Sequence, residues 1–342
     1  MAYYYNQLDK TEQRVYYAMK EGLQSLAPSF AVPRMEIRDL SNIYFLLRLD
    51  HPEIFWSVSF TCRYYPDSTA MEIIPEYLFT KNKIQDHQKA MEARVKKLAR
   101  QAEKLSEKEK ELFVHDFICE NVRYDKLKKA YSHEIIGPLG QGVGVCEGIA
   151  KSVKILCDAL NIWCIIAVSE ANPEKGIKYR HAWNVIRIDG KYYHLDATFD
   201  NSLGKAGGQI RYDYVNLSDP QISKDHEPVI WKVPACTDSD HNYYREKKLS
   251  FTKYEDVAKR AAQAVKKGKT LIFNWRGGYL TREVLKDLME IFEEEGRKKG
   301  KYAYLSLNWP QAVLQVSYKD QASEQNVVME EANEGELLET EE

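Results

Sequence analysis

The spacing of apolar residues changes along this chain, and within the first 121 residues it predicts both helices and strands. A helical period predicts a helix over 10–26, and short apolar or alternating runs predict strands. These strand predictions cover 35–38, 43–49, 55–63 and 71–74. A long charged helix is expected over 81–103, and Ser106 with Glu109 forms a capping box that begins another helix ending near Asn121.

The middle of the chain combines a helix with a hairpin. Apolar residues recur every three or four positions over 147–160, which predicts a helix packed on a core, and the run 163–168 indicates a buried strand. Two alternating runs, 181–188 and 191–198, are separated by Asp-Gly, the dipeptide most typical of a two-residue type I′ turn. We therefore expect an antiparallel hairpin whose register is fixed by the turn.

After residue 249 a further set of elements follows a stretch typical of loops. The pattern predicts helices at 254–266 and 281–299 and strands at 270–275, 302–308 and 312–318. We divide the chain into an N-terminal helix-plus-strand extension (1–80), a core (81–230), a small C-terminal α/β subdomain (250–320) and a glutamate-rich tail (321–342). The composition of the tail predicts disorder.

Cys146 is the first candidate for chemistry. The segment 142–148 reads G-V-G-V-C-E-G, so the cysteine falls in the first turn of the predicted helix. The unpaired N–H groups and the positive end of the helix dipole favour a thiolate there, and the same groups can bind an oxyanion. The two glycines let the backbone approach a substrate closely. Glu147 puts a negative charge beside the thiol, so we expect it to point away or to be neutralised.

His181 and Asp196 are candidates on the two strands of the hairpin. Counting from the turn pairs Trp183 with Asp196 and His181 with Thr198. His181 and Asp196 then share a face as diagonal neighbours, about 7–8 Å apart at the backbone. An imidazole and a carboxylate can span this gap with a hydrogen bond. The carboxylate would fix the imidazole tautomer and stabilise the imidazolium, leaving the other nitrogen to accept the thiol proton.

The sequences G-V-G-V-C-E-G-I-A-K and H-A-W-N-V-I-R-I-D-G-K-Y-Y-H-L-D-A-T resemble the transglutaminase-like superfamily, in particular its bacterial cysteine protease branch. The similarity runs from about 108 to 228. It implies an α+β fold with a papain-like core, in which a catalytic helix packs on an antiparallel sheet. It also implies that Cys146 is the nucleophile, His181 the general base and acid, and Asp196 the residue that orients the histidine.

Each of these assignments has a structural alternative. In the alternative interpretation, Cys146 is a small buried apolar residue, as free cysteines often are, and Asp196 is a cap at the end of a strand. His194 shares the face of His181 and Asp196, so it is an alternative base, or the three residues form a metal site. No zinc-type ligand spacing appears elsewhere, which argues against the metal. Cys157 and Cys164 lie in apolar patterns and are expected in the core.

Further residues are candidates around the thiol. Gln141 is a candidate oxyanion donor, because papain-like enzymes carry a glutamine a few residues before their cysteine. Trp183 and Tyr124 are candidates for the cleft, with Trp183 able to shield the ion pair from water. The loops 169–180 and 200–211 are expected to border the site. We expect no metal and no organic cofactor.

The resemblance implies acyl transfer from an amide through a thioester, on protein or peptide substrates. Hydrolysis is the preferred outcome, because no device that would favour an amine over water is evident. The alternatives are a protein-glutamine transglutaminase or deamidase, and a noncatalytic binding module that keeps the fold. The flanking regions are candidate surfaces for a protein partner.

Composition limits the classes of partner and the cellular compartments that we expect for the protein. A net charge of −2 offers no broad basic field, which argues against nucleic-acid binding. No apolar stretch is long enough to span a bilayer, and the polar, tyrosine-rich start lacks the apolar region of a signal peptide. Six scattered cysteines suit a reducing compartment. The sequence as written predicts a cytoplasmic protein, and an extracellular or cell-surface one if a leader has been removed.

Overall fold

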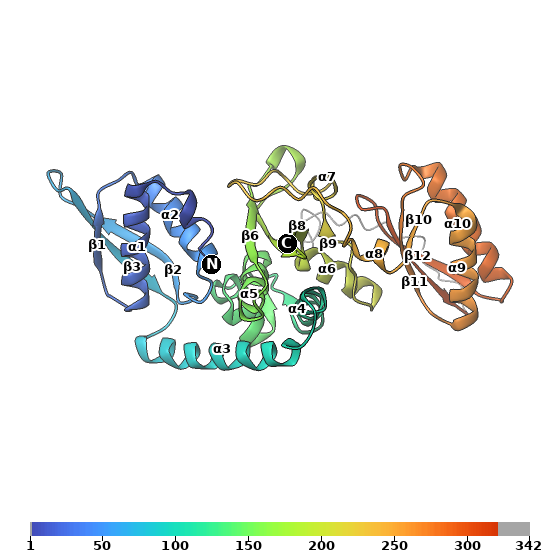
Figure 1. Cartoon of the computed structure of the whole chain (residues 1–342), viewed down its shortest axis with the longest axis horizontal. Coiled ribbons are helices and arrows are strands. Elements are labelled where there is room, and N and C mark those ends of the chain that lie inside the picture. Colours follow the sequence, from blue (N-terminus) through green and yellow to red (C-terminus); the bar gives the residue numbers. More distant parts are fainter. Residues whose placement is uncertain (1, 321–342) are drawn as a thin grey trace.

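The computed structural model describes residues 2–320, which form three units arranged along the long axis of the molecule (Figure 1). The N-terminal unit covers 2–80, the central unit 81–249 and the C-terminal unit 250–320. The helix α3 (Lys81–Ala102) runs beneath both the N-terminal and central units in this view and connects them. The predicted disordered tail, 321–342, lies outside the described residues.

The N-terminal unit is a three-stranded antiparallel sheet, in the order β1-β3-β2, with helices against it. Its elements are η1 (Tyr5–Gln7), α1 (Lys10–Gln24), β1 (Phe30–Pro33), α2 (Ile37–Asp50), β2 (Ser57–Arg63) and β3 (Ala70–Tyr77). The predicted helix at 10–26 and the predicted strands at 55–63 and 71–74 are confirmed. Asp50, at the end of α2, holds the N-terminal segment by accepting hydrogen bonds from the amides of Tyr4 and Tyr5 and the hydroxyl of Tyr16.

The strand predictions at 35–38 and 43–49 are wrong, because α2 begins at Ile37, directly after its N-cap Glu36, and contains all of 43–49. The run contains several β-type residues, Ile43, Tyr44 and Phe45, which favoured a strand. However, Leu40, Ile43, Tyr44 and Leu47 recur at helical spacing, and all four are buried. Burial of this stripe outweighs the weak strand preference of the individual residues.

The central unit begins with two helices and a short irregular segment. α4 (Glu107–Asn121) begins at Ser106, whose capping box with Glu109 is present as predicted. The segment that follows contains β4 (Arg123–Tyr124), η2 (Ala130–His133), η3 (Ile136–Gln141) and β5 (Val143–Gly144). Parallel pairing of β4 with β5 brings the chain back to the start of α5 (Cys146–Ala159).

The core of the central unit is a four-stranded antiparallel sheet, in the order β6-β7-β8-β9, with α5 packed against β7. The strands are β6 (Cys164–Ser169), β7 (His181–Ile188), β8 (Lys191–Leu195) and β9 (Val215–Leu217). Asp189 and Gly190 both have positive φ, 49° and 81°, and Ile188 pairs with Lys191. The predicted two-residue turn is therefore confirmed, and so is its register from Ile188–Lys191 to Asn184–Leu195. The predicted pairs Trp183–Asp196 and His181–Thr198 lie beyond the end of β8 and are not formed between β7 and β8. The fold is α+β.

The second strand of the hairpin ends earlier than predicted. β8 stops at Leu195, and Asp196 becomes the N-cap of α6 (Ala197–Gly207). The predicted strand to Thr198 is therefore too long by three residues, and most of the predicted loop 200–211 is helical. The physical reason is the capping preference of aspartate, whose carboxylate accepts the amides of Thr198 and Phe199.

The C-terminal unit is a four-stranded mixed sheet, in the order β10-β11-β13-β12, covered by two helices. Its elements are β10 (Ser250–Phe251), α9 (Tyr254–Lys267), β11 (Leu271–Trp275), α10 (Arg282–Arg297), β12 (Tyr302–Asn308) and β13 (Val313–Lys319). All five elements predicted for this region are confirmed. The unit has a core of its own, which includes the fully buried Phe273, Leu288 and Leu314.

After β9 the chain forms two short helices, α7 (Asp219–Ile222) and α8 (Tyr243–Glu246), before it enters the C-terminal unit. The short helix η4 (Pro173–Lys175) lies in the loop between β6 and β7. Side chains of the C-terminal unit reach the central unit through hydrogen bonds. Asn308 donates to Asp213 at 2.9 Å, and Gln311 donates to Asp225 at 3.1 Å. None of the helices within 2–320 is long and apolar enough to cross a membrane.

Candidate active site

Cys146 is the first residue of α5, as the sequence predicted. No side chain caps this end of the helix, so the first-turn N–H groups are not occupied by a capping group. The thiol is mostly buried, with 9% of the residue exposed, and its Sγ lies 4.0 Å from the carbonyl oxygen of Arg180. Because Arg180 directly precedes His181, this contact brings the thiol to the start of β7.

A glycine lets α5 approach its neighbour closely. A Cβ on Gly148 would lie 2.2 Å from the carbonyl oxygen of Ser132, a distance that no side chain can occupy. The same carbonyl accepts the amide of Val145, which fixes the chain just before the cysteine. The helix end that carries Cys146 is therefore held by backbone packing on both sides.

The charge of Glu147 is neutralised, as expected from its place beside the thiol. Its carboxylate forms ion pairs with Lys151 at 2.7 Å and Arg48 at 3.4 Å, and both cations also contact Glu134. Burial alone would raise the pKa of Glu147, but Lys151 and Arg48 hold it well below its usual range. We call Arg48, Glu134, Glu147 and Lys151 the charge cluster. It contains two cations and two anions, and it ties the N-terminal unit to α5.

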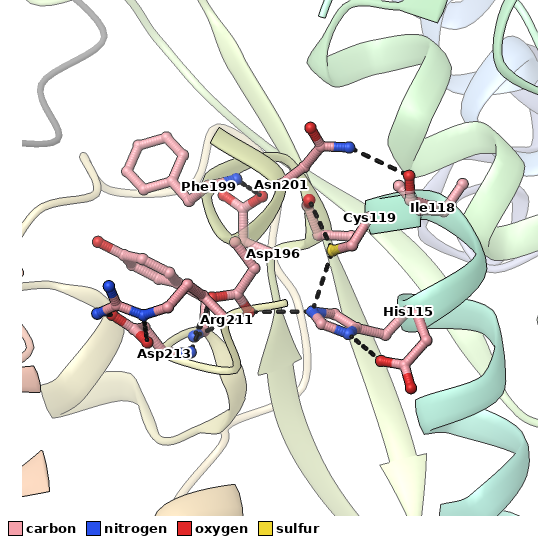
Figure 2. Close-up of polar contacts among 12 residues, drawn as sticks. His115, Ile118, Cys119, Asp196, Phe199, Asn201, Arg211 and Asp213 are labelled. Atoms are coloured by element: carbon pink, nitrogen blue, oxygen red, sulfur yellow. Dashed lines mark hydrogen bonds and ion pairs between the residues drawn. The ribbon is translucent and has the colours of Figure 1, made fainter. Parts of the chain in front are cut away.

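His181 and Asp196 are hydrogen bonded, as predicted from the hairpin. The imidazole Nε2 donates to Asp196 Oδ2 over 2.6 Å, and the two residues are 4% and 1% exposed. The other oxygen, Oδ1, accepts the amides of Thr198 and Phe199 at 2.8 and 3.1 Å, and the bond to Phe199 is visible in Figure 2. Asp196 is thus both a helix cap and a partner of the imidazole.

Burial would raise the pKa of Asp196, but His181 and His226 hold it well below its usual range. Asp196 is therefore a carboxylate and His181 carries a proton on Nε2. This arrangement fixes the tautomer of His181 and makes Nδ1 the basic nitrogen of the ring.

His226 is a functional candidate that the sequence analysis missed. Its Nε2 lies 2.9 Å from Asp196 Oδ2, the same oxygen that His181 contacts. Its Nδ1 lies 2.8 Å from Asp225 Oδ1. The residue follows α7 in a segment without hydrophobic periodicity, 30 positions after Asp196, so neither spacing nor register indicated the contact.

Aromatic rings enclose the two histidines. Trp183 stacks on His181 with ring centroids 5.7 Å apart, and Phe199 contacts both His181 and His226 at 4.9 and 4.6 Å. Trp183 is only 2% exposed, so it shields the ion pair rather than facing solvent. Low water access strengthens the hydrogen bonds to Asp196.

His194 belongs to a different polar group from His181. Its Nδ1 accepts the indole N–H of Trp183 at 2.9 Å, and its Nε2 lies 2.8 Å from Asp219. Because Nδ1 is an acceptor, Nε2 carries the proton of the neutral ring and donates to Asp219. This protonation leaves no lone pair on His194 for a metal, although His194, Asp219 and Cys236 lie close together.

A metal between His181, Asp196 and His226 also fits poorly. Their ligand atoms lie within 4.8 Å of one another, but both Nε2 atoms face the carboxylate as hydrogen-bond donors. A metal ion would have to displace both protons. The donor arrangement within 2–320 therefore supports hydrogen-bonded chemistry at this cluster.

A cavity of about 100 Å³ opens onto the thiol. Cys146 lines it together with Tyr124, Tyr179, Arg180 and Phe199. The cavity wall thus joins the thiol to Phe199, which contacts His181. Residues from the loop 169–180 and from α6 border the cavity, which agrees with the expectation that these two regions surround the site.

The remaining candidates lie elsewhere. Gln141 is exposed at the end of η3 and is not part of the cavity wall. Asn184 is also not part of the cavity wall, because it donates to the carbonyls of Ala150 and Ile165 within the core. Cys157 and Cys164 are buried in the core, also as expected.

A second buried polar group, around His115, joins α4 to α6 (Figure 2). His115 is fully buried and contacts Asp200 at 3.1 Å, Asp116 at 3.0 Å and the Sγ of Cys119 at 3.6 Å. Burial lowers its pKa, but these neighbours raise it well above the ordinary value. Asp200 also accepts the amides of Asp213 and Tyr214, so the group fixes α6 against α4 and the start of β9.

Comparisons with known proteins give the following similarities. The model of the transglutaminase-like superfamily matches residues 93–197. A solved structure described as "Crystal structure of a TGase" is 13% identical, with a TM-score of 0.30, over 58% of this chain and 60% of that one. Comparison with curated proteins gives no match.

Two further solved structures show similarity at the same low level. A "Putative Cysteine Protease" from Cytophaga hutchinsonii is 17% identical, with a TM-score of 0.24, over 41% of this chain and 62% of that one. A "putative protease" from Parabacteroides distasonis is 15% identical, with a TM-score of 0.27, over 42% of this chain and 37% of that one. The chain thus spans less than two thirds of each of these proteins.

The matched region contains Cys146, His181 and Asp196, the residues on which the resemblance rested. Residues 93–197 of this chain therefore form a domain of the transglutaminase-like superfamily.

Proposed function

We propose that this protein is a cysteine-dependent enzyme that cleaves amide bonds in protein or peptide substrates through a thioester. Cys146 is the nucleophile, His181 the general base and acid, and Asp196 the residue that orients His181. The observation that carries this proposal is the juxtaposition at the start of β7. The Sγ of Cys146 contacts the carbonyl of Arg180, and the next residue donates a 2.6 Å hydrogen bond to a buried carboxylate.

The first half of the reaction forms the thioester. His181 takes the thiol proton, and the sulfur of Cys146 attacks the amide carbon. The carbonyl oxygen becomes an oxyanion, which the first-turn N–H groups of α5 can stabilise. The imidazolium of His181 then gives its proton to the amide nitrogen, the C–N bond breaks and the amine leaves. Asp196 stabilises the imidazolium throughout and stays ionised.

Water completes the reaction. His181 removes a proton from a water molecule, which attacks the thioester carbon, and the acid is released as the sulfur takes the proton back. The rim of the cavity supports water as the acceptor. Lys178, Tyr179 and Arg180 are exposed, with 52% of Tyr179 accessible, so this edge of the site is in contact with solvent.

The test is incubation of the whole protein with a peptide library, with and without a primary amine, followed by mass spectrometry. We expect cleavage at internal amide bonds that disappears in Cys146→Ala. Cys157→Ala is the matched control, because Cys157 lies on the same helix in the core, away from the cavity. Deamidation or amine incorporation without cleavage would contradict hydrolysis of peptide bonds. Unchanged products in Cys146→Ala would contradict the nucleophile.

A further inference from the structure

Asp196 has two imidazole partners on one oxygen. His181 and His226 reach Oδ2 over 2.6 and 2.9 Å, and their ring centroids are 5.1 Å apart. The resemblance and the hairpin account for His181 alone. His226 lies on the segment after α7, far from the hairpin in sequence, and its side chain is 1% exposed.

The surroundings of His226 define its charge. Each ring nitrogen faces a carboxylate, Asp196 at Nε2 and Asp225 at Nδ1. Ionised carboxylates only accept hydrogen bonds, so both nitrogens must donate, and a ring that donates from both nitrogens is an imidazolium. Burial lowers the pKa of His226, but Asp196 and Asp225 raise it above the ordinary value overall.

Asp225 is itself held on its other oxygen. Its Oδ2 accepts the hydroxyl of Tyr214 at 2.6 Å and the amide N–H of Gln311 at 3.1 Å. Gln311 belongs to the C-terminal unit and also donates to the carbonyl of Gln221. The imidazolium is therefore supported by contacts from the central unit and from the C-terminal unit.

We propose that His226 is a positioning residue for the reaction, a cation that shares the Asp196 carboxylate with His181. This inference rests on the proposed function. The titratable groups that face the ring are Asp196, Asp225, His181 and Tyr214; the other neighbouring rings are Trp183 and Phe199.

The cation has two effects on His181. It holds the shared carboxylate in place, which keeps His181 in one orientation. Its positive charge also offsets part of the Asp196 charge, so His181 is able to release its proton at each turnover. Without His226, the buried carboxylate would act on His181 alone and would retain the imidazolium to higher pH.

The experiment measures the rate of Cys146 alkylation by iodoacetamide from pH 5 to 10, because this readout needs no substrate. In a thiolate–imidazolium pair the rate rises again at alkaline pH, when the imidazolium loses its proton. We expect His226→Gln to move this alkaline inflection upward by about one pH unit. His194→Gln is the matched control, since His194 is also buried on this sheet but bonds Asp219 and Trp183, and we expect no movement.

Asp225→Asn provides a second variant that keeps the ring and removes one of its two carboxylates. We expect a smaller shift of the inflection in the same direction, and this variant decides the matter if His226→Gln does not fold. An unmoved inflection in a folded variant, or an equal shift in His194→Gln, overturns the role of His226.

His181→Ala separates this inference from the proposed function. If His181→Ala abolishes the two-step profile while His226→Gln leaves it unchanged, only the role of His226 fails. If His181→Ala leaves the profile unchanged, the proposed function fails, and the role of His226 fails with it.

Discussion

The charge cluster at the start of α5 offers a sharp test of the electrostatics beside the thiol. Arg48, Glu134, Glu147 and Lys151 sum to zero charge, and Glu147→Gln would leave a net charge of +1. Lys151 is fully buried and Arg48 is 9% exposed, so water cannot replace the lost carboxylate. We expect this substitution to destabilise the fold, because Arg48 and Lys151 would then share a single buried carboxylate, that of Glu134.

The magnitude follows from the two ion-pair distances. At an effective dielectric constant of about 20, the attractions of Glu147 to Lys151 at 2.7 Å and to Arg48 at 3.4 Å are roughly 6 and 5 kcal/mol. The variant no longer buries a carboxylate, and the amide oxygen keeps part of the hydrogen bonding, which together offset most of this sum. Breaking a buried pair by removing one partner typically costs about 3–5 kcal/mol. We expect about 3 kcal/mol, because 17% of the Glu147 side chain is exposed.

The assay is urea unfolding at neutral and acidic pH. Glu147→Gln/Lys151→Met restores a neutral cluster and should recover at least half of the loss. Glu294→Gln is the control, since its pair with Lys298 is exposed and we expect no measurable loss of stability. A loss below about 1 kcal/mol in Glu147→Gln, or no recovery in the double variant, would refute this reasoning.

The pH dependence of the same variant has a definite sign. The pKa of Glu147 is lower in the folded protein than its ordinary value of 4.5. Its contribution is therefore present above about pH 4.5 and is lost as the pH falls through the folded value. The stability difference between the wild type and Glu147→Gln should narrow on acidification below pH 4.5, and a gap that widens would contradict this assignment.

Two further substitutions test the packing around the site. Gly148→Ala should destabilise the fold by about 2–3 kcal/mol, because its Cβ would lie 2.2 Å from the Ser132 carbonyl; a melting temperature equal to that of the wild type would contradict this packing. Tyr16→Phe should cost about 1.5–2 kcal/mol in chemical denaturation, because it removes the 2.9 Å hydrogen bond to buried Asp50, and an unchanged midpoint would show that this bond contributes nothing.

The hairpin and the helix of the central unit were predictable because their signals are local. An Asp-Gly pair with two positive φ angles fixes the pairing of Ile188 with Lys191, and the side of the sheet on which His181 lies follows from that register. The glycines before Cys146 and the apolar stripe after it define the helix start. These features depend on residues within a few positions of one another.

The sequence analysis errs or omits residues where contacts between distant parts of the chain determine the local structure. The run 43–49 was assigned to a strand from its residue types, but burial of its helical stripe makes it part of α2. Asp196 was expected inside a strand, but one of its oxygens caps α6 while the other meets His181. The contacts of His226 with Asp196 and of Gln311 with Asp225 depend on tertiary packing, and no local sequence pattern predicts them.

The most direct test of the catalytic assignment is competitive labelling of all six cysteines with iodoacetamide at pH 6, followed by peptide mapping. The account predicts that Cys146 is labelled faster than the others and that His181→Ala slows its labelling by at least about tenfold. Labelling of Cys146 at the same rate in the wild type and in His181→Ala would contradict the central claim that this imidazole activates the thiol.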